Sequence, residues 1–369
     1  MKFSVEKKQI SFGMDKVSGA VASKTIRPIL SGVMFKNKDE STYELISTDL
    51  ETYIKTEITV YNSSELESFV VEAVLLKEIV KNLPEDEIVF EKDGRNIFVK
   101  SGKATFKLPT MNPEEFPEFQ NTNVDNEITF SLSVLELMLE RSVFCANRDE
   151  LMKHLNGLFW EYSGGYLRLV AADGFRMALA EEKITKEIES SFFLTLKSMT
   201  ELLNTLKTSN SDELKVNFDD TKVSFKFDKT TLVTRIVDIE FPNYKGIIPK
   251  GFKTKIFVNR NEFIQSIRRS EITARLGSHS ILMNINDNII KLKSSSPEQG
   301  EADEDIFVKK EGEDLKISLN PKYLLESLRK VDSEEVELGF VGYNLPVQIS
   351  PIDIEGYFYI VMPIRLIDE

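Results

Sequence analysis

The sequence predicts an α+β fold made of three related domains, each with two helices packed on antiparallel strands. Three observations support this prediction. An apolar helical stripe recurs at intervals of about 123 residues, a pair of alternating segments follows each stripe, and an amphipathic helix opens each unit. The expected domains are 1–120, 121–246 and 247–369.

The helical stripes occupy equivalent places in the three units. Each has the i, i+1, i+4 spacing that puts apolar side chains on one face of a helix. The three copies are Ile79, Val80 and Leu83; Leu202, Leu203 and Leu206; and Leu324, Leu325 and Leu328. The helices that open the units are expected near 6–21, 133–145 and 260–272.

Two segments with period-two alternation follow each stripe, which predicts a β-hairpin after each helix. The paired segments are 88–90 with 97–99, 214–218 with 223–227, and 336–340 with 345–349. A strand that runs into Thr48-Asp49-Leu50-Glu51 returns at Ala172-Asp173-Gly174 and again at Ser294-Ser295-Ser296-Pro297, and Phe116-Pro117 returns as Phe241-Pro242. Because solenoid repeats reach only about 50 residues, these units are whole domains, which can join along their sheets.

Composition limits the classes of function. The 369 residues carry a formal net charge of −13, are 41% hydrophobic and include one cysteine. No run approaches the roughly 18 apolar residues of a membrane helix, and the charged N-terminus is unlike a signal peptide, so we expect a soluble, cytoplasmic protein. The acidity disfavours a conventional, basic DNA-binding domain and is also explained by solubility alone. A DNA function therefore requires positive charge on one surface and negative charge on another.

Residues with catalytic potential are few. The sequence contains no phosphate-binding glycine loop, no HExxH and no paired CxxC, and its two histidines lie in different predicted domains. We interpret Asp303-Glu304-Asp305 as a solvated acidic loop rather than a divalent-cation site. Asp173 is interpreted as a turn-former rather than a catalytic acid, and Cys145 as a buried small hydrophobe rather than a nucleophile. We expect no catalytic site, no metal and no cofactor.

Several motifs, in order along the chain, resemble those of one family. They are Arg27-Pro28-Ile29-Leu30, Thr48-Asp49-Leu50-Glu51, Leu155-Asn156-Gly157, Ala172-Asp173-Gly174-Phe175-Arg176, Phe241-Pro242-Asn243-Tyr244 and the C-terminal run 359–366. Together they resemble bacterial DNA sliding clamps, the beta subunits of DNA polymerase III. The resemblance spans essentially the whole chain.

The resemblance implies a non-catalytic ring protein. Two chains would form a head-to-tail homodimer of six domains, with twelve helices facing a hole that encloses double-stranded DNA without reading its sequence. The ring would make the polymerase processive in DNA replication. Its implied partners are the DNA polymerase III catalytic subunit, the clamp loader, the 3'-5' exonuclease of the polymerase complex, and repair proteins that carry clamp-binding peptides.

By the same resemblance, an apolar groove captures the peptides of these partners. Its implied lining is Leu155, Ala172, Gly174, Phe175, Arg176, Met177, Pro242, Ile247, Val361, Met362, Pro363, Ile364, Arg365 and Leu366. Phe175 replaces the commoner histidine or tyrosine, and Ile364 replaces methionine. Methionine and branched aliphatic side chains suit a surface that adapts to several partners. The alternative is that Val361, Met362 and Ile364 belong to an ordinary core strand.

Two further sets of residues are predicted for the ring. The residues expected to face DNA are Lys24, Arg27, Lys77, Lys81, Arg148, Lys153, His154, Lys197, Arg268, Arg269, Lys322 and Arg329. For each of them the alternative is a solvated surface charge, and Lys153-His154 stands where the family usually has two aromatic residues. The expected dimer contact joins Lys103, Phe106, Lys107 and Leu108 to Ile272, Glu298, Glu301 and Glu304, because opposite charges around an apolar centre fix orientation.

Two other functions stay open at this point. A three-domain scaffold with the same fold that does not encircle DNA would be monomeric. An enzyme with a carboxylate-bound metal would lose its activity when Asp173 is replaced.

Overall fold

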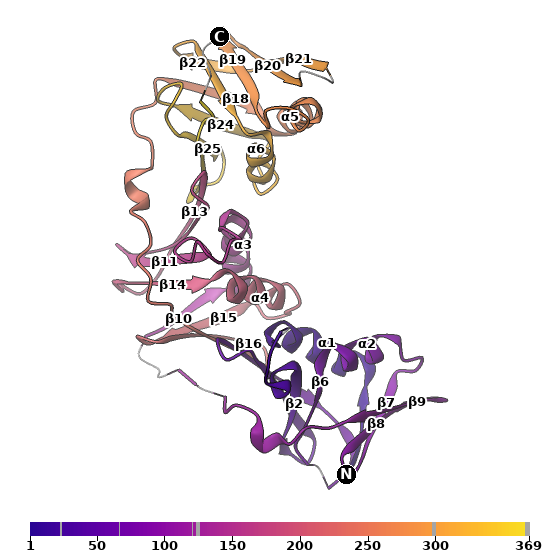
Figure 1. The fold of residues 1–369 in the computed structure, drawn as a ribbon. Helices are drawn as coiled ribbons and strands as arrows, with labels where there is room; N and C mark the ends of the chain where they lie inside the picture. The colour runs from indigo at the N-terminus through magenta and orange to yellow at the C-terminus, as the bar shows by residue number, and fades with distance from the viewer. Residues whose placement is uncertain (23, 66, 120, 123–125, 297–299, 366–369) are drawn as a thin grey trace. The chain divides into compact units, whose positions relative to one another are not determined.

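The computed structural model describes residues 1–22, 24–65, 67–119, 121–122, 126–296 and 300–365 (Figure 1). The chain divides into two compact units. Unit 1 combines Met1–Glu136 with Lys197–Val237, and unit 2 combines Leu137–Leu196 with Asp238–Glu369. The chain therefore passes three times between the units, after residues 136, 196 and 237, and the predicted central domain contributes to both.

Unit 1 contains the N-terminal strands and helices together with the second half of the central region. Its first elements are β1 (Lys2–Glu6), α1 (Lys7–Val17), β2 (Gly32–Asp39), β3 (Thr42–Thr48), β4 (Thr52–Thr59), β5 (Tyr61–Ser64), β6 (Phe69–Glu72), α2 (Ala73–Asn82), β7 (Glu87–Asp93), β8 (Asn96–Ser101), β9 (Ala104–Pro109) and β10 (Asn126–Ser131). Its later elements are α4 (Leu196–Leu206), β15 (Glu213–Phe218), β16 (Lys222–Phe227) and β17 (Thr230–Arg235), and α3 (Leu132–Ser142) is divided between the units.

Two sheets organise unit 1. The smaller has the order β5-β1-β7-β8-β9, and the larger has the order β10-β15-β16-β17-β4-β3-β2-β6. In the larger sheet, β17 pairs with β4 in antiparallel register, with Leu232 opposite Ile54. This pairing joins strands from the first and second predicted domains into one sheet.

Unit 2 contains the first half of the central region and the C-terminal region. Its first elements are the 3-10 turn Val143–Cys145, β11 (Gly157–Ser163), β12 (Tyr166–Ala172), β13 (Arg176–Lys183) and β14 (Ser190–Thr195). Its later elements are β18 (Thr254–Asn259), α5 (Arg260–Ala274), β19 (Ile281–Asn286), β20 (Ile289–Ser296), β21 (Gly300–Phe307), β22 (Lys309–Gly312), β23 (Leu315–Leu319), α6 (Pro321–Leu328), β24 (Glu335–Phe340), β25 (Val347–Pro351) and β26 (Tyr357–Val361).

The sheets of unit 2 repeat the arrangement of unit 1. A nine-stranded sheet has the order β14-β11-β12-β13-β26-β25-β24-β18-β22, and a four-stranded sheet has the order β21-β20-β19-β23. β13 pairs with β26, with Met177 opposite Ile360, so the second and third predicted domains also share a sheet.

The structure confirms the α+β fold and its repeated pattern. The stripes lie on α2, with Leu83 directly after its end, and on α4 and α6. The hairpins are β7–β8, β15–β16 and β24–β25, and the opening helices are α1, α3 and α5. The stripe side chains are mostly buried, which explains their spacing, because a helix buries one apolar face against a sheet. The exact domain boundaries remain predictions.

One interpretation from the sequence is wrong. Asp303, Glu304 and Asp305 do not form a loop, because they lie in β21, the terminal strand of the four-stranded sheet. Lys293 stands opposite Asp303 in the neighbouring strand and pairs with it at 2.9 Å, so cross-strand ion pairing supports an acidic strand here. Within the described residues no group of three or more acidic, histidine or cysteine side chains is placed to hold a metal ion. No helix of that part of the chain is long and apolar enough to cross a membrane.

Candidate peptide-binding groove

The site begins at the turn between β12 and β13. Asp173 Oδ1 accepts hydrogen bonds from the backbone N–H groups of Phe175 at 2.9 Å and Arg176 at 3.1 Å. Gly174 has φ +93°, a conformation that glycine adopts without strain. The turn-forming role predicted for Asp173 is confirmed, and the turn fixes where the side chain of Arg176 leaves the sheet.

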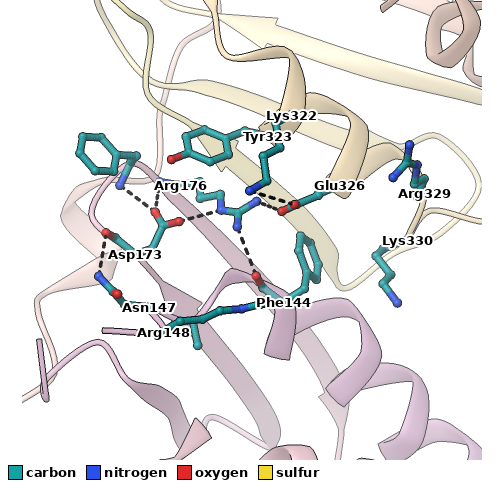
Figure 2. Close-up of a pocket in the computed structure, with 12 residues that line it drawn as sticks. Phe144, Asn147, Arg148, Asp173, Arg176, Lys322, Tyr323, Glu326, Arg329 and Lys330 are labelled. Carbon is teal, nitrogen blue, oxygen red and sulfur yellow. Dashed lines mark hydrogen bonds and ion pairs between the residues drawn. The ribbon is translucent and has the colours of Figure 1, made fainter. Parts of the chain in front are cut away.

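Arg176 is held by groups from three parts of unit 2, which are the turn after β12, helix α6 and the 3-10 turn at Phe144 (Figure 2). Its Nε donates to Asp173 Oδ2 at 2.8 Å, Nη1 pairs with Glu326 on α6, and Nη2 donates to the Phe144 carbonyl at 3.3 Å. Its guanidinium also lies 4.5 Å from the centre of the Tyr323 ring. The side chain is only 9% exposed, so two carboxylates compensate a charge that is nearly removed from water.

An apolar cavity of about 490 Å³ lies on one side of Arg176. Its floor includes Met177 and Ile360, which face each other across the β13–β26 pair. The full lining is Ala172, Gly174, Arg176, Met177, Gly246, Ile247, Ile248, Pro249, Lys250, Val341, Leu345, Pro346, Ile360 and Met362. Most of this lining is aliphatic, with few polar groups to fix orientation, which is the usual character of a ligand pocket.

A second, polar cavity of about 550 Å³ also has Arg176 in its wall (Figure 2). Basic side chains surround it, contributed by Arg148, Lys322, Arg329 and Lys330. The remaining lining is Phe144, Ala146, Asn147, Asp173, Phe175, Tyr323 and Glu326. Arg176 therefore separates an apolar cavity from a basic one.

The structure gathers much of the predicted groove at this place. Ala172, Gly174, Arg176, Met177, Ile247 and Met362 line the apolar cavity, and Phe175 lines the polar one. The other described members of the predicted set, which are Leu155, Pro242, Val361, Pro363, Ile364 and Arg365, are not in the lining of either cavity. Leu366 falls outside the described residues.

Strand geometry explains why Val361 does not line the apolar cavity. Side chains alternate between the two faces of a strand, so Ile360 and Met362 face the apolar cavity and Val361 faces away, fully buried. Leu155 is likewise buried, at 6% exposure. The backbone of Ile364 forms a bridge to β23, where its N–H donates to the Ser318 carbonyl at 2.8 Å.

Several lining residues are absent from the set predicted from the sequence. Ile360 follows from period-two alternation with Met362, a signal that was available. Ile248, Leu345 and Glu326 carry no local signal, because each comes from a segment far from Arg176 in the chain.

The residues predicted to face DNA are spread over helices and loops of both units. Lys77 and Lys81 lie on α2, Lys197 on α4, Arg268 and Arg269 on α5, and Lys322 on α6 with Arg329 directly after it, whereas Lys24, Arg27, Arg148, Lys153 and His154 lie outside the helices and strands. Most are exposed, but some have acidic neighbours within their own unit. Lys77 pairs with Asp15 at 2.9 Å, Lys197 pairs with Asp49, and Arg269 Nε donates to Glu304 at 2.9 Å.

The residues predicted for the dimer contact lie on two terminal strands and one helix. Lys103 precedes β9, and Phe106, Lys107 and Leu108 lie on it; Glu301 and Glu304 lie on β21, and Ile272 lies on α5. Phe106 and Ile272 are exposed, at 41% and 59%, whereas Leu108 is buried within its own chain. Glu304 is engaged by Arg269 and Ser266, and Glu298 falls outside the described residues.

Cys145 lies beneath this site. It is fully buried, as predicted, and burial raises the pKa of its thiol far above the ordinary range. A thiol that stays protonated is a poor nucleophile.

Comparison with known proteins supports one family. Models of the DNA polymerase III beta subunit match its N-terminal domain at residues 1–120, its central domain at 129–243 and its C-terminal domain at 245–365. The crystal structure of the DNA polymerase III beta subunit from Thermotoga maritima is 41% identical, covers 99% of each chain and superposes with a TM-score of 0.95. The beta sliding clamps of Bacillus subtilis and Proteus mirabilis are 29% and 28% identical, and each comparison covers 99% of this chain and 100% of the relative. The chain belongs to the DNA polymerase III beta subunit family, the beta sliding clamps.

Proposed function

We propose that this chain acts as a sliding clamp by forming a two-subunit ring around duplex DNA, while the groove beside Arg176 holds partner proteins. The observation that carries the proposal is the match of the family to all three repeated domains along the whole chain. The same match supports a role in DNA replication as the accessory subunit that makes the polymerase processive. We place this activity in the cytoplasm, with the replicative polymerase and its clamp loader.

Ring closure is proposed to pair β9 of one copy with β21 of a second copy. Each is the terminal strand of its described sheet, and an exposed strand edge is ready to pair with another strand. Lys103 is exposed just before β9, Lys107 is exposed on β9 and Glu301 is exposed on β21, so the two edges carry opposite charge. A head-to-tail contact of this kind closes into a ring when its rotation allows.

Weak attraction to phosphates is proposed to let the ring slide. Lys81 on α2, Arg268 on α5 and Lys322 on α6 are exposed and belong to helices predicted to face the hole. The pairing of Lys77, Lys197 and Arg269 with carboxylates lowers the local positive charge. Sequence-independent attraction is then weak, which suits sliding rather than tight binding.

The apolar cavity is proposed to receive short peptides from the polymerase, the clamp loader and repair proteins. Its support is the aliphatic floor at Met177 and Ile360, with Arg176 held at the edge by two carboxylates. A sliding clamp from Pseudomonas aeruginosa, 25% identical, has been crystallised with griselimycin. We expect griselimycin to bind here and Met362→Lys to weaken it at least about tenfold in calorimetry. Tyr343→Asp, on an exposed residue outside the lining, is the matched control.

The ring is tested by retention on DNA of different topology. Labelled protein is loaded on a nicked circular plasmid with a clamp loader, separated from free protein by gel filtration, and the plasmid is then linearised. Retention on the circle with loss after cutting is expected, because a ring slides off free ends. Equal retention on both forms would mean ordinary binding, and no retention with an active loader would favour the scaffold alternative.

Oligomeric state tests the closing contact separately. Reversal of Lys103 and Lys107 to Glu places like charges opposite Glu301, so we expect dimerisation to weaken at moderate salt in sedimentation equilibrium. Reversal of Lys36 and Lys38, exposed on β2, keeps the same net charge change and is expected to leave the dimer intact. An unchanged dimer after the first reversal would remove β9 from the interface.

A further inference from the structure

A second hollow of about 410 Å³ adjoins the apolar cavity in unit 2. Ile248 lines both spaces, so they meet at one residue. The hollow is lined by Arg168, Leu179, Glu181, Tyr244, Lys245, Ile248, Gly356, Tyr357 and Phe358.

The two spaces lie on the same face of the same two strands. Met177 pairs with Ile360 under the apolar cavity, and Leu179 pairs with Phe358 under the hollow. Since side chains alternate, these pairs share a face and lie roughly 7 Å apart along the strands. Tyr244 and Ile248 pack in one cluster with Met177, Leu179, Ile360 and Phe358, so the floor of both spaces is a single apolar surface.

The charged groups around the hollow compensate one another. Glu161 accepts from the Tyr244 hydroxyl at 2.7 Å and from Lys245 Nζ at 2.8 Å, and it pairs with Arg168 at 3.4 Å. Arg168 also pairs with Glu181 at 2.5 Å. Two cations therefore face two carboxylates, and this balance favours an uncharged occupant on the apolar floor.

Gly356 lets the chain pass close to the backbone of β13 at the edge of the hollow. Its φ is +73°, and a Cβ at this position would lie 2.4 Å from the Glu181 carbonyl oxygen, so a side chain does not fit. The Glu181 N–H donates to the Gly356 carbonyl at 2.5 Å, which holds the backbone there.

We propose that this hollow is a second compartment of the docking groove. It receives an apolar side chain of the partner peptide about two extended residues beyond the part held at Met177 and Met362. The inference rests on the proposed function of the groove. The second compartment implies that a partner peptide with an apolar residue two positions beyond the segment held at Met177 and Met362 binds more tightly than a peptide without one.

The test uses a fluorescent peptide of about 12 residues, long enough in extended form to span both compartments. It is selected from a random display library on the wild-type chain and then shortened from each end to the shortest form that still binds. We expect one truncation to lower affinity about 5- to 20-fold, the effect of losing one buried apolar side chain. Phe358→Asp is expected to weaken the long peptide to the level of the short one and to leave the short one unchanged.

Unchanged binding of the short peptide shows that Phe358→Asp is folded. The hollow can also be blocked by a Lys245→Cys variant labelled with a bulky maleimide. The label reacts selectively with the new cysteine because the natural Cys145 is buried. It is expected to remove the same advantage of the long peptide. If neither change alters the ratio of long to short affinity, the second compartment is wrong. If Met362→Lys leaves both peptides bound, the groove itself is wrong, so the two failures are distinguishable.

Discussion

Neighbouring repeats share a sheet at two joins, the β4–β17 pair in unit 1 and the β13–β26 pair in unit 2. The two joins have the same turn but different side chains packed beside it. At the first join, in unit 1, Asp49 Oδ1 accepts from the N–H groups of Glu51 at 3.1 Å and Thr52 at 2.8 Å. At the second join, in unit 2, Asp173 accepts in the same way from Phe175 and Arg176. The residue three places after each aspartate enters the join: Thr52 in one and Arg176 in the other.

Small hydroxyl groups close the first join. Thr52 Oγ1 lies 2.8 Å from Ser198 Oγ, and the Thr234 hydroxyl donates to the same Ser198 oxygen at 2.8 Å, with all three residues buried. Arg176 at the second join is long and charged, so it needs two carboxylates and borders two cavities. The same turn therefore carries a small hydroxyl residue at the first join and, at the second, a charged residue that borders two cavities.

Replacement of Arg176 by alanine should have the largest effect. It leaves the carboxylate of Asp173 without its cation and Glu326 with only Lys322, 4.0 Å away, so we expect a loss of about 3 kcal/mol in the unfolding free energy of unit 2. Urea unfolding followed by fluorescence of Trp160, the single tryptophan, measures it. In a double-mutant cycle Glu326→Gln should recover part of the loss. A loss below about 1 kcal/mol would show that Arg176 does not stabilise the second join.

Replacement of Thr52 by valine should have a smaller effect at the first join. It removes one buried hydrogen bond while Ser198 keeps Thr234, so we expect a loss of about 1 kcal/mol. Hydrogen exchange of the β4 and β17 amides measures the unfolding free energy of unit 1 separately from that of unit 2. Thr52→Ser keeps the hydroxyl and serves as the control. An equal loss in both variants would assign the effect to packing instead of the hydrogen bond.

The smallest expected effect concerns Lys16, a cation buried near the first join as Arg176 is at the second. Its Nζ donates to the Thr205 carbonyl at 2.6 Å between the rings of Phe12 and Phe227, and burial lowers its pKa to about 8. Between that value and its ordinary 10.5, the unfolded chain holds a proton that the folded chain has lost. The stability of unit 1 should therefore rise with pH across this window.

Lys16→Met tests this assignment. It should flatten the pH dependence and raise stability at pH 7 by about 1 kcal/mol, since no buried charge remains. Amide exchange of α1 between pH 7 and pH 10, corrected for intrinsic rates, is the measurement. A wild-type stability that falls as pH rises through the window would contradict the lowered pKa.

The repeated fold could be predicted because its signals are local. The stripes and hairpins follow from periods of 3.6 and 2 within single segments. The site was less predictable because motif resemblance transfers runs of residues, whereas a strand offers only alternate side chains to a groove, as Ile360 and Val361 show. The partnership of Arg176 with Glu326 bridges 150 positions, and no single segment encodes it.

The strand conformation of the acidic residues in β21 could not be predicted from the sequence either. Three consecutive acidic residues have low strand propensity, so a loop was the natural interpretation. Their cross-strand partners, such as Lys293 for Asp303, determine the outcome and become visible only when the register is known.

The central claim is that partner peptides bind at the second join and not at the first. Amide hydrogen exchange, measured with and without the peptide selected from the display library, tests it most directly. We predict slower exchange at 172–179 and 358–362, around the floor of the groove, and no change at the equivalent first join, 48–55 and 230–235. Protection of the first join, or of both joins equally, would contradict the account.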